Sequence, residues 1–161
     1  LVVTNAAEIA ERFAGRKGVA VLRDPEADGG PLAALHAALK EAGGETALVL
    51  ASDLPFITEE PLRALAAIAG GNPAAAAVVP RIDGMPQPLC AVYAPAAREA
   101  ARVVLAGGSR RLLDLLGAIP VRWVDGAELG CGAGCRWFAD VDTWGDYAEA
   151  RAAMKEAGHA P

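Results

Sequence analysis

Short apolar runs alternate with longer helical patterns along most of this 161-residue chain. The predicted strands are residues 1–4, 19–22, 46–52, 75–79, 89–93 and 121–124. The predicted helices are residues 5–13, 31–42, one opened by Thr58, 95–107, 109–116 and a last one capped by Thr143. This alternation predicts an α/β fold with a mostly parallel, three-layer sheet. We expect one domain over residues 1–157, an antiparallel excursion near residues 82–93 around the Asp-Gly turn, and a frayed tail at 158–161.

Composition excludes several classes of protein. The chain has 15 basic and 20 acidic side chains, which is not the basic footprint of a nucleic-acid binder. No apolar run is long enough to span a bilayer, and the chain does not start with the basic and then apolar residues of a signal peptide. We therefore expect a cytoplasmic protein without nucleic-acid or membrane partners.

The three cysteines give little support for a metal or disulfide framework. Their number is odd, which argues against complete pairing. Cys131 and Cys135 are four residues apart in a glycine-rich stretch, which is not the usual spacing of a zinc hook, and no second pair follows. We expect incidental thiols in a flexible loop.

Asp53 is the strongest single candidate for chemistry. It follows the apolar run 46–50 and precedes Pro55, which stiffens the turn and restricts Leu54 to an extended shape. In open α/β sheets, ligands bind just outside the carboxyl ends of strands. A carboxylate there is well placed to hold a metal ion against a phosphate. The alternative is that Asp53 only caps a turn or the next helix.

A second acidic pair lies near the end of the chain. Asp140 and Asp142 flank Val141, so on a strand the two carboxylates would point the same way. Taken alone, Asp142 is explained by its place at the entry to a helix, where an acidic residue is locally favourable. Taken with Asp53, it predicts that carboxylates from two separate strand ends share one metal ion.

Two further segments suit an anion. Gly29 and Gly30 precede Pro31 at a predicted helix start, where bare amides and the positive end of the helix dipole favour a phosphate. Arg110 and Arg111 stand at another helix start, where an anionic partner would offset their unfavourable interaction with the dipole. The alternatives are an ordinary loop for the glycines and solvated surface for the arginines.

Five segments, read in chain order, resemble the molybdenum cofactor guanylyltransferase family. They are Asp24 with residues 30–33, residues 52–56, residues 87–89 with 91–93, residues 107–113, and residues 138–143. Each is weak alone, but the resemblance spans nearly the whole chain. It implies a Rossmann-like nucleotidyltransferase fold and transfer of GMP from GTP to the phosphate of molybdenum-molybdopterin, with release of pyrophosphate.

The resemblance also implies roles for particular residues. Asp53 would bind Mg²⁺, and Asp24 would contact the guanine nucleotide. Asn5 is the nearest candidate for a GTP-binding asparagine. We hypothesise that Asp142 completes the metal site and that the backbone of Gly29 and Gly30 positions the nucleotide. The candidate acceptor-binding residues are Gln87, Arg110, Arg111 and Asp140.

The chain departs from the family pattern in two ways. The N-terminal Leu-Ala-Gly-Gly loop that holds the triphosphate is absent, and Leu1 would match the second strand of the fold. We therefore expect the first strand, that loop and the first helix to precede this chain in the complete protein, and this fragment alone to lack part of the catalytic machinery. Asp140 and Asp142 replace asparagines that are frequent in the family, which puts the base specificity in question.

Rival functions stay open. One is a sister nucleotidyltransferase with another base or acceptor, such as a molybdenum cofactor cytidylyltransferase. Another is a non-catalytic homologue that binds a nucleotide or a partner, and a plain α/β scaffold would leave the ordered motifs unexplained. Candidate protein partners are recipient molybdoenzymes or their chaperones.

Overall fold

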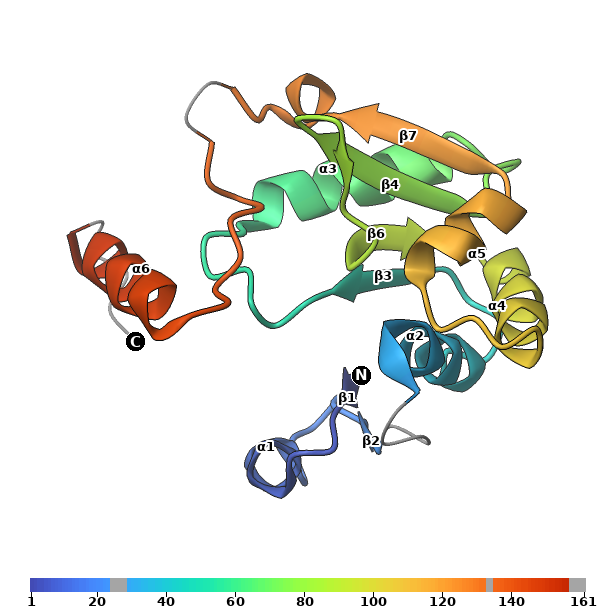
Figure 1. Cartoon of the computed structure of the whole chain (residues 1–161), viewed down its shortest axis with the longest axis horizontal. Helices are drawn as coiled ribbons and strands as arrows, with labels where there is room; N and C mark the ends of the chain where they lie inside the picture. Colours follow the sequence, from blue (N-terminus) through green and yellow to red (C-terminus); the bar gives the residue numbers. More distant parts are fainter. Residues whose placement is uncertain (24–28, 133–134, 157–161) are drawn as a thin grey trace.

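A mixed β-sheet between layers of helices forms the body of the protein (Figure 1). The computed structural model describes residues 1–23, 29–132 and 135–156. In chain order the elements are β1 (Val2–Val3), α1 (Ala7–Phe13), β2 (Val21–Leu22), α2 (Gly30–Glu41), β3 (Ala47–Leu50), α3 (Glu59–Gly70), β4 (Ala77–Ile82), β5 (Met85–Pro86), β6 (Cys90–Tyr93), α4 (Ala96–Ala106), α5 (Leu112–Ala118), β7 (Val121–Asp125), the 3-10 helix η1 (Gly126–Leu129) and α6 (Trp144–Glu156). The predicted succession of strands and helices is confirmed.

The main sheet has the strand order β3-β6-β4-β5, with β7 paired to β4. β7 is parallel to β4, whereas β6 lies antiparallel between β3 and β4. β3, β4 and β7 therefore run in one direction, as expected of a mostly parallel α/β sheet. β6 and the short β5 are the predicted antiparallel excursion. The turn between β4 and β5 contains Asp83 at φ 49° and Gly84 at φ 81°. Tight hairpin turns need positive φ angles at both central residues, which is why Asp-Gly is favoured there.

One face of the sheet, here called the first face, is covered by α2, α4 and α5. Alternate residues of the central strands point to it, such as Ala77 and Val79 of β4 and Ala91 and Tyr93 of β6. They meet leucines spaced along these helices, and Leu32 of α2 and Leu115 of α5 are completely buried. The apolar spacing that predicted these helices is therefore explained by burial of one side of each.

The opposite face, here called the second face, has a different cover. Val78, Cys90 and Val92 point to it and pack with Leu65 of α3. Much of the remaining cover is the irregular segment 136–142, which brings Trp137 and Phe138 against the same cluster. Helices on both faces confirm the three-layer architecture.

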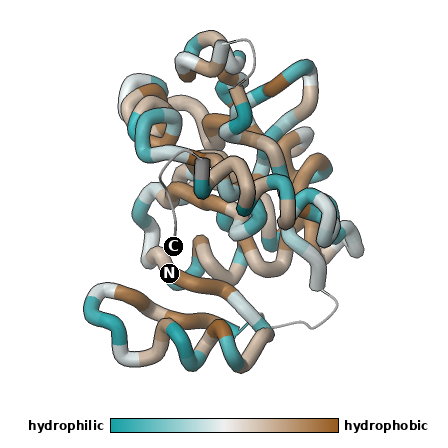
Figure 2. The backbone as a smooth tube through the Cα atoms, turned by 90° about the vertical axis from the view of Figure 1, so that its left-hand side faces the viewer, coloured by the Kyte–Doolittle hydropathy of each residue, from teal (hydrophilic) through white to brown (hydrophobic). Residues whose placement is uncertain are grey.

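The residues before Asp24 form a small unit of their own. β1 and β2 pair in parallel as a two-stranded sheet, with Val2 opposite Val21 and Val3 opposite Leu22. Figure 1 shows this unit, with α1, below β3 and α2, and Figure 2 shows it at the bottom of the view, with hydrophobic and hydrophilic stretches in alternation. Among the described residues, no helix is long and apolar enough to cross a membrane.

Two predicted helix starts are wrong in detail, whereas those of α3, which has Thr58 as its N-cap, and of α6 are confirmed. α1 has Ala6 rather than Asn5 as its N-cap, and the Ala6 amide donates instead to Thr4 Oγ1 at 3.1 Å. α5 has Arg111 as its N-cap, while Ser109 Oγ accepts from the Arg111 amide at 3.2 Å. At the start of α6, Thr143 Oγ1 accepts from the Asp146 amide at 3.2 Å, as predicted for a cap.

Candidate functional site

Asp53 lies in the loop that follows the carboxyl end of β3. The Ala51 amide donates to the carbonyl of Leu89 at 2.6 Å and extends the pairing of β3 with β6 by one step. Leu54 is 9% exposed and is anchored in the second-face cluster. Because Leu54 points inward, its neighbours Ser52 and Asp53 are held at the surface, where both are exposed. The predicted position of Asp53 at a strand end is therefore what the structure has.

Segment 136–142 lies directly against this loop. The Val141 amide donates to the carbonyl of Asp53 at 3.0 Å, and the two loops run side by side between β3 and α6 in Figure 1. The guanidinium carbon of Arg136 is 4.0 Å from the ring centroid of Phe56, a distance at which a cation is attracted by the face of the ring. The two acidic segments are therefore neighbours, joined at the Asp53 backbone.

The local structure of the second acidic pair differs from the prediction. Asp140 and Asp142 are exposed, but the segment that holds them contains no helix or strand among its described residues. Its described backbone hydrogen bonds are a turn from Ala139 to Arg136 and the contact of Val141 with Asp53. The apolar side chains of Trp137 and Phe138 hold the segment by packing rather than by a strand ladder, which is why an alternating pattern did not mean a strand.

The two predicted anion-binding segments also meet. Gly29 is buried, and Gly30 begins α2 with φ 68°. A Cβ on Gly30 would lie 3.3 Å from Cβ of Arg110 and 3.4 Å from its carbonyl oxygen, so only glycine suits this close approach. The backbone of Arg110 therefore rests on the start of α2, and Arg110 and Arg111 are both exposed beside it.

Gln87 lies in the loop that leads into β6. Its amide donates to the Pro80 carbonyl at 2.9 Å, and its carbonyl accepts from the Cys90 amide at 3.1 Å. The buried Tyr93 donates its hydroxyl to the Pro88 carbonyl at 2.8 Å, and burial raises the pKa of that hydroxyl. Since Leu89 pairs with Ala51, this loop lies at the same sheet edge as the Asp53 loop.

Other predicted residues are placed differently or not described. Asn5 is exposed just beyond β1, in the two-stranded unit. Asp24 lies outside the described residues. Sequence reasoning missed the contact between Arg136 and Phe56, because the two residues are far apart in the chain and no local pattern links them.

The expectation of incidental thiols at Cys131 and Cys135 is wrong. The two form a disulfide with a Cα–Cα distance of 5.3 Å, within the range that a disulfide spans. The odd number of cysteines argued against complete pairing, but two can still pair when the third is left over. That third cysteine, Cys90, is buried and free. Burial raises the pKa of its thiol to about 11, so Cys90 stays protonated at neutral pH.

The acidic residues at this edge bear on the predicted metal site. Within residues 1–23, 29–132 and 135–156 there is no group of three or more His, Cys, Asp and Glu side chains that could hold a metal ion. A complete protein cage is thus not present in the described chain. Two exposed carboxylates on adjoining loops, Asp53 and Asp142, suit Mg²⁺, which uses one or two carboxylates and takes its other ligands from phosphates and water.

Comparison with known proteins identifies the family. Residues 1–132 match the family model described as the MobA-like NTP transferase domain. The chain belongs to this family. Its relatives include the probable molybdenum cofactor guanylyltransferases of Bacillus velezensis and Bacillus subtilis, each 32% identical over 91% of this chain and 72% of the relative. The resemblance noted in the sequence is thereby confirmed.

Two solved structures agree with the fold. The molybdopterin-guanine dinucleotide biosynthesis protein A of Archaeoglobus fulgidus is 26% identical, with a TM-score of 0.79 over 96% of this chain and 77% of that protein. A protein from Aquifex aeolicus, 19% identical with a TM-score of 0.68, shares the fold. The MobA-like architecture therefore extends over nearly the whole chain.

Proposed function

We propose that the complete protein is a molybdenum cofactor guanylyltransferase. A phosphate oxygen of molybdenum-molybdopterin attacks the α-phosphorus of GTP, the bond from that phosphorus to the bridging oxygen of the β-phosphate breaks, and pyrophosphate leaves. The family and the names of its relatives support this proposal. In such a transfer, the protein contributes chiefly by positioning the reactants and neutralising charge.

The observation that carries the proposal is the hydrogen bond from the Val141 amide to the Asp53 carbonyl. It joins two exposed acidic segments that are nearly ninety positions apart in the sequence. Asp53 and Asp142 would hold Mg²⁺ in this proposal. Magnesium, when bound, neutralises phosphate charge and so favours attack by another anion.

The other candidate residues keep the roles predicted for them from the sequence. The amides at the start of α2, with Gly29 and Gly30, would bind an anionic part of the nucleotide, and Asp24 and Asn5 would contact the rest of GTP. The candidate residues for binding the acceptor are Gln87, Arg110, Arg111 and Asp140. The backbone of Arg110 approaches Gly30, so the two predicted anion-binding segments lie side by side. The Arg110 guanidinium itself donates to the carbonyls of Leu105 and Ser109 at 3.3 and 3.4 Å, near the end of α4.

One specific observation favours a second candidate. Asp140 and Asp142 stand where the family frequently has asparagines, and the Asp-Val-Asp-Thr form resembles cytidylyl- and other nucleotidyltransferases. Turnover assays with GTP, CTP and ATP in competition separate the two. GMP transfer at least tenfold above the other nucleotides supports the guanylyltransferase, and a preference for CTP replaces it with the cytidylyltransferase.

The decisive variant is Asp53→Asn in the complete protein. It keeps the shape of the side chain but removes its charge, so magnesium-dependent GMP transfer should fall by about a hundredfold or more. Asp83→Asn is the matched control, since Asp83 is also exposed and asparagine tolerates its positive φ. Near wild-type turnover in Asp53→Asn, measured as pyrophosphate released, would refute the assignment of Asp53.

A further inference from the structure

The Cys131–Cys135 disulfide closes a five-residue ring at the start of the chain segment that reaches Asp53. Both cysteines are half-buried, and Gly132 inside the ring is exposed. The disulfide is therefore not sealed in the core, where a reductant could not reach it. Disulfides with accessible sulfurs are the ones that exchange readily with thiols.

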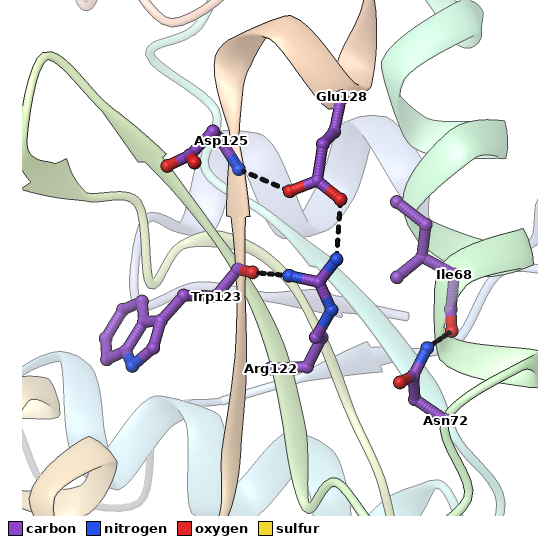
Figure 3. Close-up of polar contacts among 6 residues, drawn as sticks. All are labelled: Ile68, Asn72, Arg122, Trp123, Asp125 and Glu128. Carbon is purple, nitrogen blue, oxygen red and sulfur yellow. Dashed lines mark hydrogen bonds and ion pairs between the residues drawn. The ribbon is translucent and has the colours of Figure 1, made fainter.

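The chain before the ring is fixed to the sheet. The Cys131 amide donates to the Gly126 carbonyl at 2.8 Å, within the η1 turn that follows β7. Figure 3 shows how η1 is held: Glu128 accepts from the Asp125 amide at 3.1 Å and pairs with the Arg122 guanidinium at 2.5 Å. Arg122 also donates to the Trp123 carbonyl. Cys131 is thus attached to a firm part of the molecule.

The chain after the ring is held much more lightly. It contacts the Asp53 loop through Arg136 on Phe56 and through the Val141 amide on the Asp53 carbonyl, and its apolar residues pack on the second face. No regular secondary structure supports segment 136–142 among its described residues. The disulfide ties the start of this segment directly to the fixed residue Cys131.

We propose that the Cys131–Cys135 disulfide is a reversible redox site that sets how firmly segment 136–142 rests on the Asp53 loop. The reductant is a dithiol. One of its thiolates attacks a protein sulfur and breaks the S–S bond, and its second thiolate then closes the reductant's own disulfide. Two electrons and two protons pass to the protein, leaving thiols at Cys131 and Cys135.

Reduction opens the ring and leaves glycine-rich backbone between Cys131 and segment 136–142. The segment then has more conformations available when it is not on the Asp53 loop, so its contacts with Asp53 and Phe56 weaken. Asp142 is on this segment and Asp53 is not. Reduction should therefore weaken metal binding by the pair, a consequence that rests on the proposed function, whereas the change in the segment does not.

Hydrogen exchange of the Val141 amide tests the structural part. The complete protein is compared after air oxidation and after reduction with dithiothreitol, with mass spectrometry reporting the disulfide. Reduction should speed exchange at Val141 about tenfold. The Ala94 amide, which donates to the Ala76 carbonyl at 2.9 Å in the sheet, should be unaffected. Equal exchange at Val141 in both states, or no disulfide in the air-oxidised protein, would overturn the proposal.

Variants separate the pair from the third cysteine. The double variant Cys131→Ser with Cys135→Ser should show fast exchange at Val141 with or without dithiothreitol. Cys90→Ala should still respond to dithiothreitol, because Cys90 is buried and takes no part in the disulfide. A dithiothreitol response that persists in the double variant would overturn the assignment. If the double variant does not fold, the comparison of Val141 exchange in the oxidised and reduced unsubstituted protein still decides the proposal.

Titration calorimetry with Mg²⁺ tests the functional part. Reduction should weaken Mg²⁺ binding about tenfold. Faster exchange at Val141 together with no Mg²⁺ binding in either state supports the redox site and contradicts the proposed metal site. Equal Mg²⁺ affinity in both states together with unchanged exchange overturns the redox proposal and leaves the proposed function standing.

Discussion

The two faces of the sheet are covered in different ways. On the first face, α2, α4 and α5 bury leucines at regular spacing against β4 and β6. On the second face, α3 does this only in part, and Trp137 and Phe138 of an irregular segment supply much of the rest. That irregular segment also carries Asp140 and Asp142 and contacts Asp53.

The difference teaches where stability and chemistry are separated in this fold. The first face is held by helices whose packing is set along their whole length, so each buried leucine contributes to the global free energy of unfolding. Segment 136–142 is held by a few side chains and backbone contacts, so it can open without unfolding of the sheet. Asp140 and Asp142 of the candidate site thus lie on a segment that can move without unfolding of the sheet.

The largest effect on stability is expected on the first face. Leu115→Ala should lower the free energy of unfolding by about 3 kcal/mol, because it leaves a cavity at a completely buried position. Leu113→Ala, in the same helix but 47% exposed, should change it by less than about 0.5 kcal/mol. Urea unfolding measures both. If the two variants lost equal free energies of unfolding, α5 would not be packed on one side only.

A smaller effect is expected on the second face. Trp137→Ala should cost about 2 kcal/mol, because Trp137 is half-buried against the cluster of Leu54 and Leu65. It should also speed exchange at the Val141 amide. Trp144→Ala is the matched control, since Trp144 is 86% exposed and contacts Tyr147 of its own helix. It should cost less free energy of unfolding than Trp137→Ala and leave exchange at Val141 unchanged. A Trp137→Ala protein with slow exchange at Val141 would show that packing does not hold the segment.

The smallest effect is a pH dependence at the end of that segment. Hydrogen bonds from the hydroxyl and amide of Thr143 lower the pKa of the Asp146 carboxyl below its ordinary 3.8. A lowered folded-state pKa means that this stabilisation is present above pH 3.8 and is lost as the pH falls through the lower value. The Thr143 amide shift in NMR should therefore change below pH 3.8, and Asp146→Asn should remove that change.

Several parts of the fold followed from local sequence. Apolar spacing predicted the helices that bury leucines, and the Asp83-Gly84 pair predicted the β4–β5 hairpin because few residues tolerate its positive φ angles. Thr143 was predicted as a cap because its hydroxyl meets a helix amide three residues along. Such features depend on neighbours in the chain, so a single sequence contains them.

The sequence by itself determined which residues are candidates: a carboxylate at a strand end, a second acidic pair, glycines and arginines at helix starts. Only the tertiary structure decided which of these meet. It placed Val141 on Asp53 and Arg110 on Gly30, paired Cys131 with Cys135, and put Asp140 and Asp142 on an irregular segment instead of a strand. The physical reason is that long-range packing fixes such contacts and local patterns carry no record of it. For Val141 on Asp53, that packing is the buried cluster of Leu54, against which Trp137 and Phe138 lie.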